Sequence, residues 1–117
     1  MFVRCEAPDL DLTKYPNFIY EQTDGEWWMK WKDYYCLFQY EEDVDVLWNS
    51  TVRVGKSDIG LLTVAIKTLN QLFDEGYTRQ AMGWESGYKS ELIIKRVARH
   101  FNIIAEDDEY IVFERGE

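Results

Sequence analysis

The chain has little histidine, little cysteine and no long apolar run. His100 is its single histidine, and the sequence does not indicate a nucleophile or a carboxylate beside it, so no catalytic triad is predicted. Cys5 and Cys36 show no metal-site spacing, and a secreted domain of this size would more often carry several disulfide pairs. No stretch has the length of a signal peptide's apolar region or of a membrane span. These absences favour a cytoplasmic protein with two buried, reduced thiols.

Positive charge is also scarce. Lysine and arginine number 13 against 22 aspartates and glutamates, which gives a net charge of −9. This charge favours solubility, and it disfavours binding to nucleic-acid phosphates or to anionic membranes. We therefore expect a protein partner with a basic surface, and neither direct nucleic-acid contact nor membrane association.

Aromatic side chains are abundant, at 16% of the residues. With 46% apolar residues in all, the chain is expected to form one domain, residues 1–117, with its own core. Aromatic residues beyond the needs of the core make surfaces that partners bind. Trp28 and Tyr35 are the candidates for such a surface, because Trp28 shares a strand face with Lys30. The alternative is that a helix covers them.

The N-terminal half has the pattern of an antiparallel meander. Asp24-Gly25 supplies the positive φ angles of a tight hairpin turn. Asp9 is placed to cap a short helix that follows it. The expected elements, in order, are a strand at 2–5, a short helix at 10–15, and strands at 18–22, 26–31, 34–40 and 44–51.

The C-terminal half alternates helical and extended patterns. Apolar residues at helical spacing predict helices over 59–73 and 90–101, and Gly76 lies where a left-handed residue ends the first. Strands are expected over 78–84, from Ile103 and over 110–114. The predicted fold class is α+β, a mixed sheet with an antiparallel N-terminal meander and two main helices.

This order of elements resembles the GNAT (Gcn5-related N-acetyltransferase) fold over nearly the whole chain. Phe2-Val3-Arg4 stands where the family's first strand begins. The segment from Leu61 to Phe73, with Gly76-Tyr77-Thr78 after it, resembles the central helix and the strand beyond. The resemblance implies an acetyl-CoA site at the N-terminus of the 59–73 helix, where glycines let backbone amides approach the pyrophosphate.

The family's coenzyme motif is degenerate here. The motif is Arg or Gln, two residues, Gly, one residue, then Gly or Ala, and aligning its end on Gly60 places Gly55 at the Arg or Gln. Asp58 then stands at the first glycine and sets a carboxylate beside the phosphate, which Arg53 and Lys56 would partly offset. The coenzyme residues that the resemblance implies are Gly55, Lys56 and Gly60.

The family's catalytic tyrosine is missing as well. Val97 or Ala98 falls where the resemblance places it, and Tyr88 is the phenol nearest to that position. No general base is singled out by spacing, so the catalytic residues stay unknown. The open candidates for the base are Glu41, Glu42, Asp45 and Glu85.

Two acidic turns complete the pattern. Glu41, Glu42 and Asp43 form one turn, and Asp107 and Asp108 belong to the other. Neither has the ligand pattern of a calcium loop, so no metal is expected and a solvated turn is the simplest reading. If the turns lie on one face, they imitate a polyanion and bind a basic protein surface.

Two functions follow from these observations. The first is a non-catalytic binding protein on a degenerate acetyltransferase-like scaffold, without cofactor. Its size, acidity and aromatic content resemble phage or mobile-element proteins, either virion components or inhibitors of a host protein. The alternative is an acetyl-CoA-dependent N-acetyltransferase that acts on an amine substrate.

Overall fold

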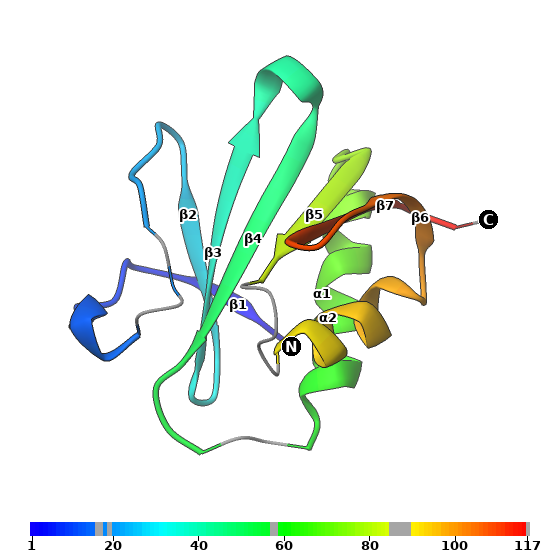
Figure 1. Ribbon diagram of the computed structural model, residues 1–117. Helices are drawn as coiled ribbons and strands as arrows, with labels where there is room; N and C mark the ends of the chain where they lie inside the picture. The colour runs from blue at the N-terminus through cyan, green and yellow to red at the C-terminus, as the bar shows by residue number, and fades with distance from the viewer. Residues whose placement is uncertain (16–17, 19, 57–58, 85–89, 117) are drawn as a thin grey trace.

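The computed structural model describes residues 1–15, 18, 20–56, 59–84 and 90–116 (Figure 1). Seven strands and two α-helices are found in this part of the chain, with two short 3₁₀ helices. In chain order they are β1 (Val3–Cys5), η1 (Leu12–Lys14), β2 (Trp27–Trp31), β3 (Tyr34–Glu41), η2 (Glu42–Val44), β4 (Val46–Arg53), α1 (Leu61–Asp74), β5 (Arg79–Gly83), α2 (Ser90–Ala98), β6 (Asn102–Glu106) and β7 (Tyr110–Glu114).

All seven strands form one mixed sheet in the order β1-β2-β3-β4-β5-β7-β6. Strands β2, β3 and β4 pair antiparallel in series, as in the predicted meander, and β1 pairs antiparallel with β2. Strand β5 is parallel to β4, because α1 carries the chain back before β5 begins. The predicted α+β class, with its mixed sheet, N-terminal meander and two main helices, is confirmed, and it is consistent with a GNAT-like fold.

Helices α1 and α2 cover one side of the sheet, which we call the helix face. The register Trp27↔Phe38 and Met29↔Cys36 places these four side chains on that face, as strand alternation predicts. They join one buried cluster with apolar residues of both helices, and Phe113 at its centre is fully buried. The sheet is therefore held to its helices by a continuous apolar layer.

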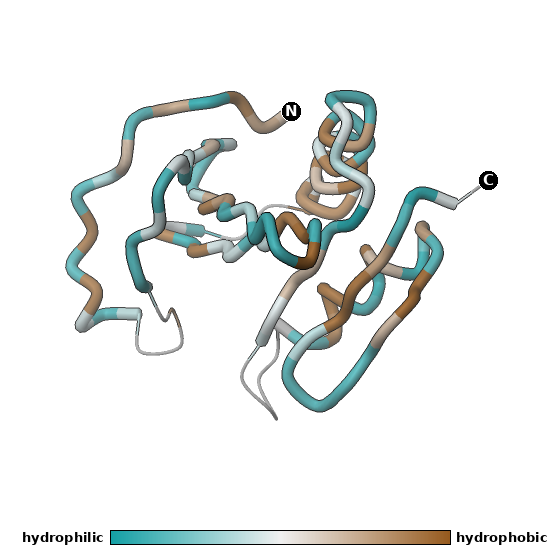
Figure 2. Tube along the Cα trace, turned by 90° about the horizontal axis from the view of Figure 1, so that it is seen from above, coloured by the Kyte–Doolittle hydropathy of each residue, from teal (hydrophilic) through white to brown (hydrophobic). Residues whose placement is uncertain are grey.

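The segment before β2 departs from the prediction. No strand is found among the described residues of the expected 18–22 strand, and β1 pairs with β2 instead. Phe18 and Tyr20 lie against Trp28, at ring-centroid distances of 6.0 and 6.3 Å, on the face opposite the helices. In the view from above, the N-terminal segment starts beside α1 and then runs along the outside of the sheet (Figure 2). Aromatic packing has replaced a strand ladder here.

Helix boundaries follow local chemistry. Helix α1 ends before Gly76, whose φ of +111° is the left-handed conformation expected of it. Helix α2 ends three residues before the predicted boundary, at Ala98. Asp11, rather than Asp9, caps the first 3₁₀ helix by accepting a hydrogen bond of 3.1 Å from the Thr13 amide. The predicted cap was therefore displaced by two residues.

Candidate functional site

Strand β4 has two ends that carry different chemistry. Its C-terminal end, with the β2–β3 turn and the loop into α1, is called the loop end. Its N-terminal end, with the β3–β4 turn and the C-terminus of α1, is called the acidic end. Figure 1 shows them at opposite ends of the long β3–β4 hairpin.

At the loop end, the side chain of Asp33 occupies the turn into α1. Its Oδ2 atom accepts a hydrogen bond of 3.0 Å from the Lys56 amide, and its carbonyl accepts one of 2.7 Å from the Val54 amide. A Cβ atom added to Gly55 would lie 2.6 Å from the Asp33 carboxyl carbon. Gly55 is therefore needed for the close approach of Asp33. The Lys56 amide is therefore already engaged by a carboxylate of the chain itself.

Gly60 stands at the start of α1, as the sequence predicted. It is the N-cap residue, and its carbonyl accepts the first helical bond, 3.1 Å from the Val64 amide. Ile59 before it is fully exposed. Asp58, which stands at the first glycine of the expected coenzyme motif, lies outside the described residues.

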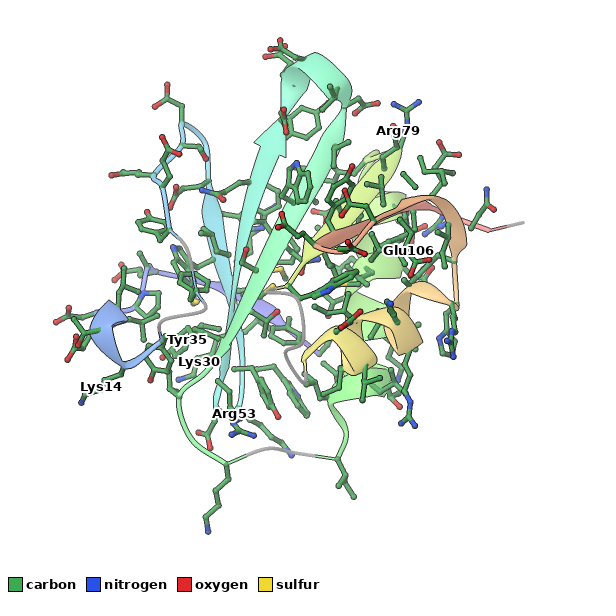
Figure 3. All side chains as sticks on the ribbon, in the orientation of Figure 1. Lys14, Lys30, Tyr35, Arg53, Arg79 and Glu106 are labelled. Carbon is green, nitrogen blue, oxygen red and sulfur yellow. The ribbon has the colours of Figure 1, made fainter. Side chains whose placement is uncertain are left out.

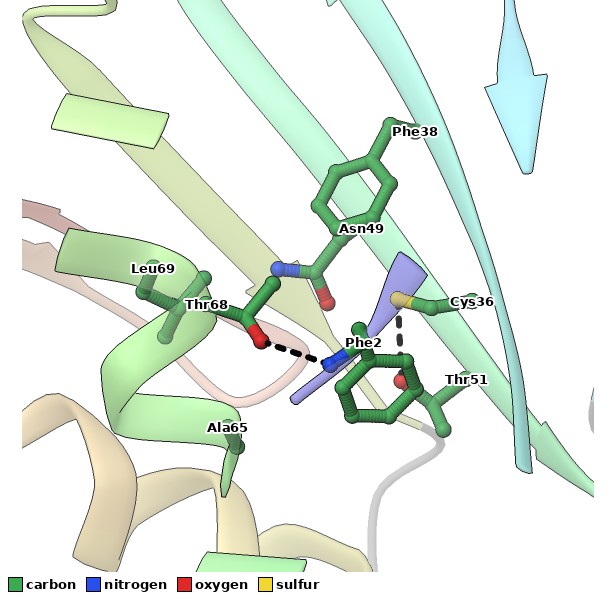
Figure 4. A pocket seen from close by; sticks show the side chains of 8 residues that line it. All are labelled: Phe2, Cys36, Phe38, Asn49, Thr51, Ala65, Thr68 and Leu69. Carbon is green, nitrogen blue, oxygen red and sulfur yellow. Dashed lines mark hydrogen bonds between the residues drawn. The ribbon is translucent and has the colours of Figure 1, made fainter. Parts of the chain in front are cut away.

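A small cavity lies against the middle of α1 (Figure 4). Its volume is about 40 Å³, room for one or two water molecules. Asn49 is 7% exposed, and its side-chain amide reaches this cavity without a hydrogen bond to the described residues. Cys36 accepts a hydrogen bond of 3.3 Å from the Thr51 hydroxyl, and burial raises the pKa of the Cys36 thiol to about 12. The thiol is thus a structural group, not a nucleophile.

The sheet opens at the loop end. The β4–β5 ladder has three residue pairs and ends at Asn49↔Met82. The last four residues of β4, Ser50 to Arg53, have no ladder partner on the β5 side among the described residues. Within the described chain, this edge of β4 near the N-terminus of α1 is therefore unpaired.

At the acidic end, Asp45 joins three elements. Its carboxylate accepts hydrogen bonds from the Tyr40 hydroxyl, at 2.6 Å, and from the Thr78 hydroxyl. These two bonds, and the charge of Arg79, hold the pKa of Asp45 below its usual value. Asp45 has a φ of +52°, a left-handed conformation that aspartate tolerates better than most residues. It is a turn-forming carboxylate that is already engaged.

The other base candidates lie at this same end. The Glu41 carboxylate accepts a hydrogen bond of 2.9 Å from the Trp48 indole, and Glu42 and Asp43 are exposed in η2. An eight-residue strand spans about 26 Å, so the length of β4 lies between these residues and the loop that leads to Gly60. Glu85 and Tyr88 lie outside the described residues. The structure does not bring the expected coenzyme residues and these base candidates together.

The second acidic turn does not join the first. The register of β5, β6 and β7 places Asp107 and Asp108 at the loop end, where the Glu109 carbonyl accepts a bond of 2.8 Å from the Trp84 amide. The continuous polyanionic surface imagined from the sequence is therefore absent from the described chain.

The aromatic candidates separate as well. Trp28 is 7% exposed, because Phe18 and Tyr20 cover it, so its expected exposure was wrong. Tyr35 is half-buried, with the Lys30 ammonium 5.4 Å from its ring centroid; Figure 3 labels this pair. Packing by the N-terminal segment, rather than by a helix, removes Trp28 from the surface.

A different aromatic group was missed from the sequence. Tyr77 lies 5.8 Å from Trp27 and 5.7 Å from Tyr40, between ring centroids, at the acidic end. These three residues come from separate elements, so no local pattern joins them. The position of Tyr77 after Gly76 was the one available signal, because the helix must end there.

Two absences concern the described residues. They contain no group of three or more histidine, cysteine, aspartate or glutamate side chains placed to hold a metal ion. None of their helices combines the length and apolar character needed to cross a bilayer.

The chain resembles a solved structure but matches no known family or curated sequence. No protein-family model matches the chain, and no curated protein matches it. One matching structure is that of AAC(6')-Ib in complex with paromomycin and acetyl-CoA, at 16% identity and a TM-score of 0.49. The match covers 77% of this chain and 64% of that one, so this chain spans less than two thirds of that protein's length. At this identity and score, the likeness assigns no activity.

Proposed function

We propose that the chain is a non-catalytic binding protein whose acidic end contacts a basic surface of a protein partner. The observation that carries the proposal is the Asp33 carboxylate, which lies on the Lys56 amide and against Gly55. A second anion at this position meets the charge of the first. Two of the three residues expected to hold a coenzyme are thus engaged within the chain.

The state of the described base candidates supports the same proposal. Acyl transfer needs a base that is free to take the proton of the reacting amine. Asp45 and Glu41 are instead engaged by side chains of their own fold.

The acidic end is the surface that suits a basic partner. Two of its arginines already form ion pairs within the chain: Arg79 pairs with Glu114 at 3.2 Å, and Arg115 pairs with Asp74 at 2.6 Å. Glu42 and Asp43 have no cation partner among the described residues. The idea of a phage or mobile-element protein, a virion component or an inhibitor of a host protein, rests on composition and fits this role.

One observation favours the alternative, an acetyl-CoA-dependent N-acetyltransferase. The open edge of β4 beyond Asn49 lies beside the N-terminus of α1, and unpaired strand edges accept extended ligands. Calorimetric titration with acetyl-CoA, with thermal unfolding alongside, decides between the two. We expect no heat and no thermal shift at millimolar acetyl-CoA. Micromolar binding that is lost in Gly60→Leu, and kept in the Gly116→Leu control, would overturn the non-catalytic proposal.

The partner is tested by crosslinked capture from a host lysate. The triple variant Glu41→Gln, Glu42→Gln, Asp43→Asn is compared with the charge-matched Asp107→Asn, Asp108→Asn, Glu109→Gln at the other turn. We expect capture to be salt-sensitive and to be lost in the first variant alone. Capture that is unchanged in the first variant contradicts a role for the acidic end.

A further inference from the structure

An aromatic surface lies within the acidic end, on the helix face. The rings of Tyr40 and Tyr77 meet edge to face, with centroids 5.7 Å apart and planes at 62°. The Tyr77 ring also stacks on Trp27, at 5.8 Å and 29°. Tyr40 is 40% exposed and Tyr77 is half-buried, so both present ring surface to solvent. Tyrosine and tryptophan in this setting are the residue types that dominate binding energy at interfaces.

The chain shows which chemistry this surface accepts, because it already holds one cation. The guanidinium carbon of Arg4 lies 4.6 Å from the centroid of the Trp27 ring. Its ion pair with Glu75 is long, at 3.8 Å, so its position depends on the ring as well as the carboxylate. The five cation–ring contacts found among the described residues involve neither Tyr40 nor Tyr77. The cluster is therefore only partly used.

Carboxylates lie beside the two tyrosines, with Arg4 and Arg79 as nearby cations. Asp45 is bonded to the Tyr40 hydroxyl, and Glu42 and Asp43 are exposed in the adjoining 3₁₀ helix. The last turn of α1 contains no basic residue, and its C-cap is Glu75. Carboxylates at a helix C-terminus add to the negative end of the helix dipole, where a cation is favoured. Arg4 and Arg115 already pair with Glu75 and Asp74 at that helix end, whereas Glu42 and Asp43 have no cation partner among the described residues.

We propose that Tyr40 and Tyr77, flanked by Glu42, Asp43 and Asp45, bind an arginine side chain of the partner's basic surface. This rests on the proposed function and names the contact within it. A guanidinium stacks on an aromatic face and still donates to carboxylates at its edge, which a lysine ammonium does less well. The internal Arg4–Trp27 pair is the same arrangement one ring away.

The probe is a short arginine-rich peptide, titrated into the intact protein by calorimetry at low salt. Matched peptides carry lysine or the neutral isostere citrulline at the same positions. We expect the arginine peptide to bind, the lysine peptide to bind more weakly, and the citrulline peptide not to bind. Nuclear magnetic resonance spectra should show the largest shifts at Tyr40, Tyr77 and the Trp27 indole, with little change at Trp48.

Variants separate the ring from the charge. Tyr40→Leu removes the exposed ring and should weaken arginine-peptide binding roughly three- to tenfold, whereas Tyr40→Phe keeps the ring and should retain most of the affinity. Tyr35→Leu, at the loop end, is the matched control and should have no effect. Circular dichroism verifies that each variant is folded, and Tyr40→Leu changes an exposed side chain, so its fold should survive.

Each other outcome gives a clear answer. If Glu42→Gln with Asp43→Asn weakens binding while Tyr40→Leu and Tyr77→Leu do not, the aromatic site is refuted and the acidic surface of the proposed function stands. If lysine and arginine peptides bind equally, the preference for arginine is refuted. If no cationic peptide binds, this inference is refuted, while lysate capture and the acetyl-CoA titration still decide the proposed function.

Discussion

The carboxylate of Asp33 and the amide of Lys56, 23 positions apart in sequence, are joined by a hydrogen bond of 3.0 Å. The β2–β3 turn that presents Asp33 includes Lys32 in a left-handed conformation, with φ of +49°. The bond ties this turn to the loop that leads into α1. It sets the course of the chain at the loop end, and it explains a glycine that the sequence assigned to a coenzyme.

We predict that Asp33→Ala lowers the free energy of unfolding by about 1 kcal/mol. The value is at the low end for a hydrogen bond to a charged group, because Asp33 is exposed. Urea denaturation measures it, with Asp9→Ala as a control at another exposed aspartate. A loss equal to that of the control would mean that the loop holds its course without Asp33.

Gly55→Ala should destabilise the protein by roughly 1–2 kcal/mol, because its Cβ meets the Asp33 carboxyl group. In the Asp33→Ala background the space is free, and the cost should shrink or change sign, since alanine restricts the unfolded chain. A double-mutant cycle by urea denaturation gives the coupling. Strict additivity of the two changes would show that Gly55 serves some other contact.

Gln80 offers a test of buried polarity. Its side chain is fully buried. Its Nε2 atom donates a hydrogen bond of 2.9 Å to the Leu69 carbonyl, and its Oε1 atom has no hydrogen-bond partner in the described chain. Gln80→Met should change stability by less than about 1 kcal/mol, because one bond is lost and one orphaned oxygen removed. Gln80→Glu should cost about 3 kcal/mol or more at pH 7, with partial recovery in acid as the carboxyl protonates. Equal stabilities at pH 7 would contradict the burial of this side chain.

Asp45 should make the protein acid-sensitive. Its pKa is lowered in the folded state, mainly by the hydrogen bonds from Thr78 and Tyr40. Its contribution is therefore complete above the ordinary aspartate pKa, about 4, and is lost as pH falls through the lower folded pKa. Asp45→Asn keeps the left-handed turn and should flatten stability against pH in this acid range. Asp43→Asn is the control, and equal flattening in both variants would remove Asp45 as the cause.

The two thiols should differ in reactivity. Burial raises the pKa of Cys36 to about 12, whereas Cys5 is half-buried, with a pKa raised less by desolvation. A chromogenic disulfide reagent at pH 8 should modify Cys5 first, and Cys36 only when denaturant unfolds the chain. In Cys5→Ser the native protein should be unreactive. Rapid modification of that variant would show that the core around Cys36 opens.

Much of the fold follows from local pattern. The closing strand Tyr110–Glu114 was predicted with its observed bounds, because alternation and flanking acidic residues define it. A turn is present at Asp24-Gly25, with φ of +75° at Gly25, but the predicted hairpin is not, because the described residues before it form no strand. The strand expected at 18–22 failed because Phe18 and Tyr20 have high strand propensity yet pack on Trp28 instead. Strand propensity alone could not distinguish a segment that covers Trp28 with aromatic rings from a segment that pairs as a strand.

The site was harder to predict. Gly55 and Gly60 were recognised as special, but the reason for Gly55 is Asp33, which is distant in sequence and belongs to an ordinary turn. Strand direction decides that the two acidic turns lie at opposite ends of the sheet, and the order β5-β7-β6 cannot be read from residue type. Likewise, the contact of Tyr40 with Tyr77 depends on a parallel crossover rather than on spacing.

The short parallel ladder between β4 and β5 also bears on how the molecule comes apart. Three residue pairs join these strands, against eight between β3 and β4. The sheet thus consists of two antiparallel blocks, β1 to β4 and β5 to β7, which meet at one short parallel seam. Helix α1 connects the two blocks in sequence. Partial unfolding should begin at this seam, and in refolding the blocks should form before they are joined, since the crossover must close first.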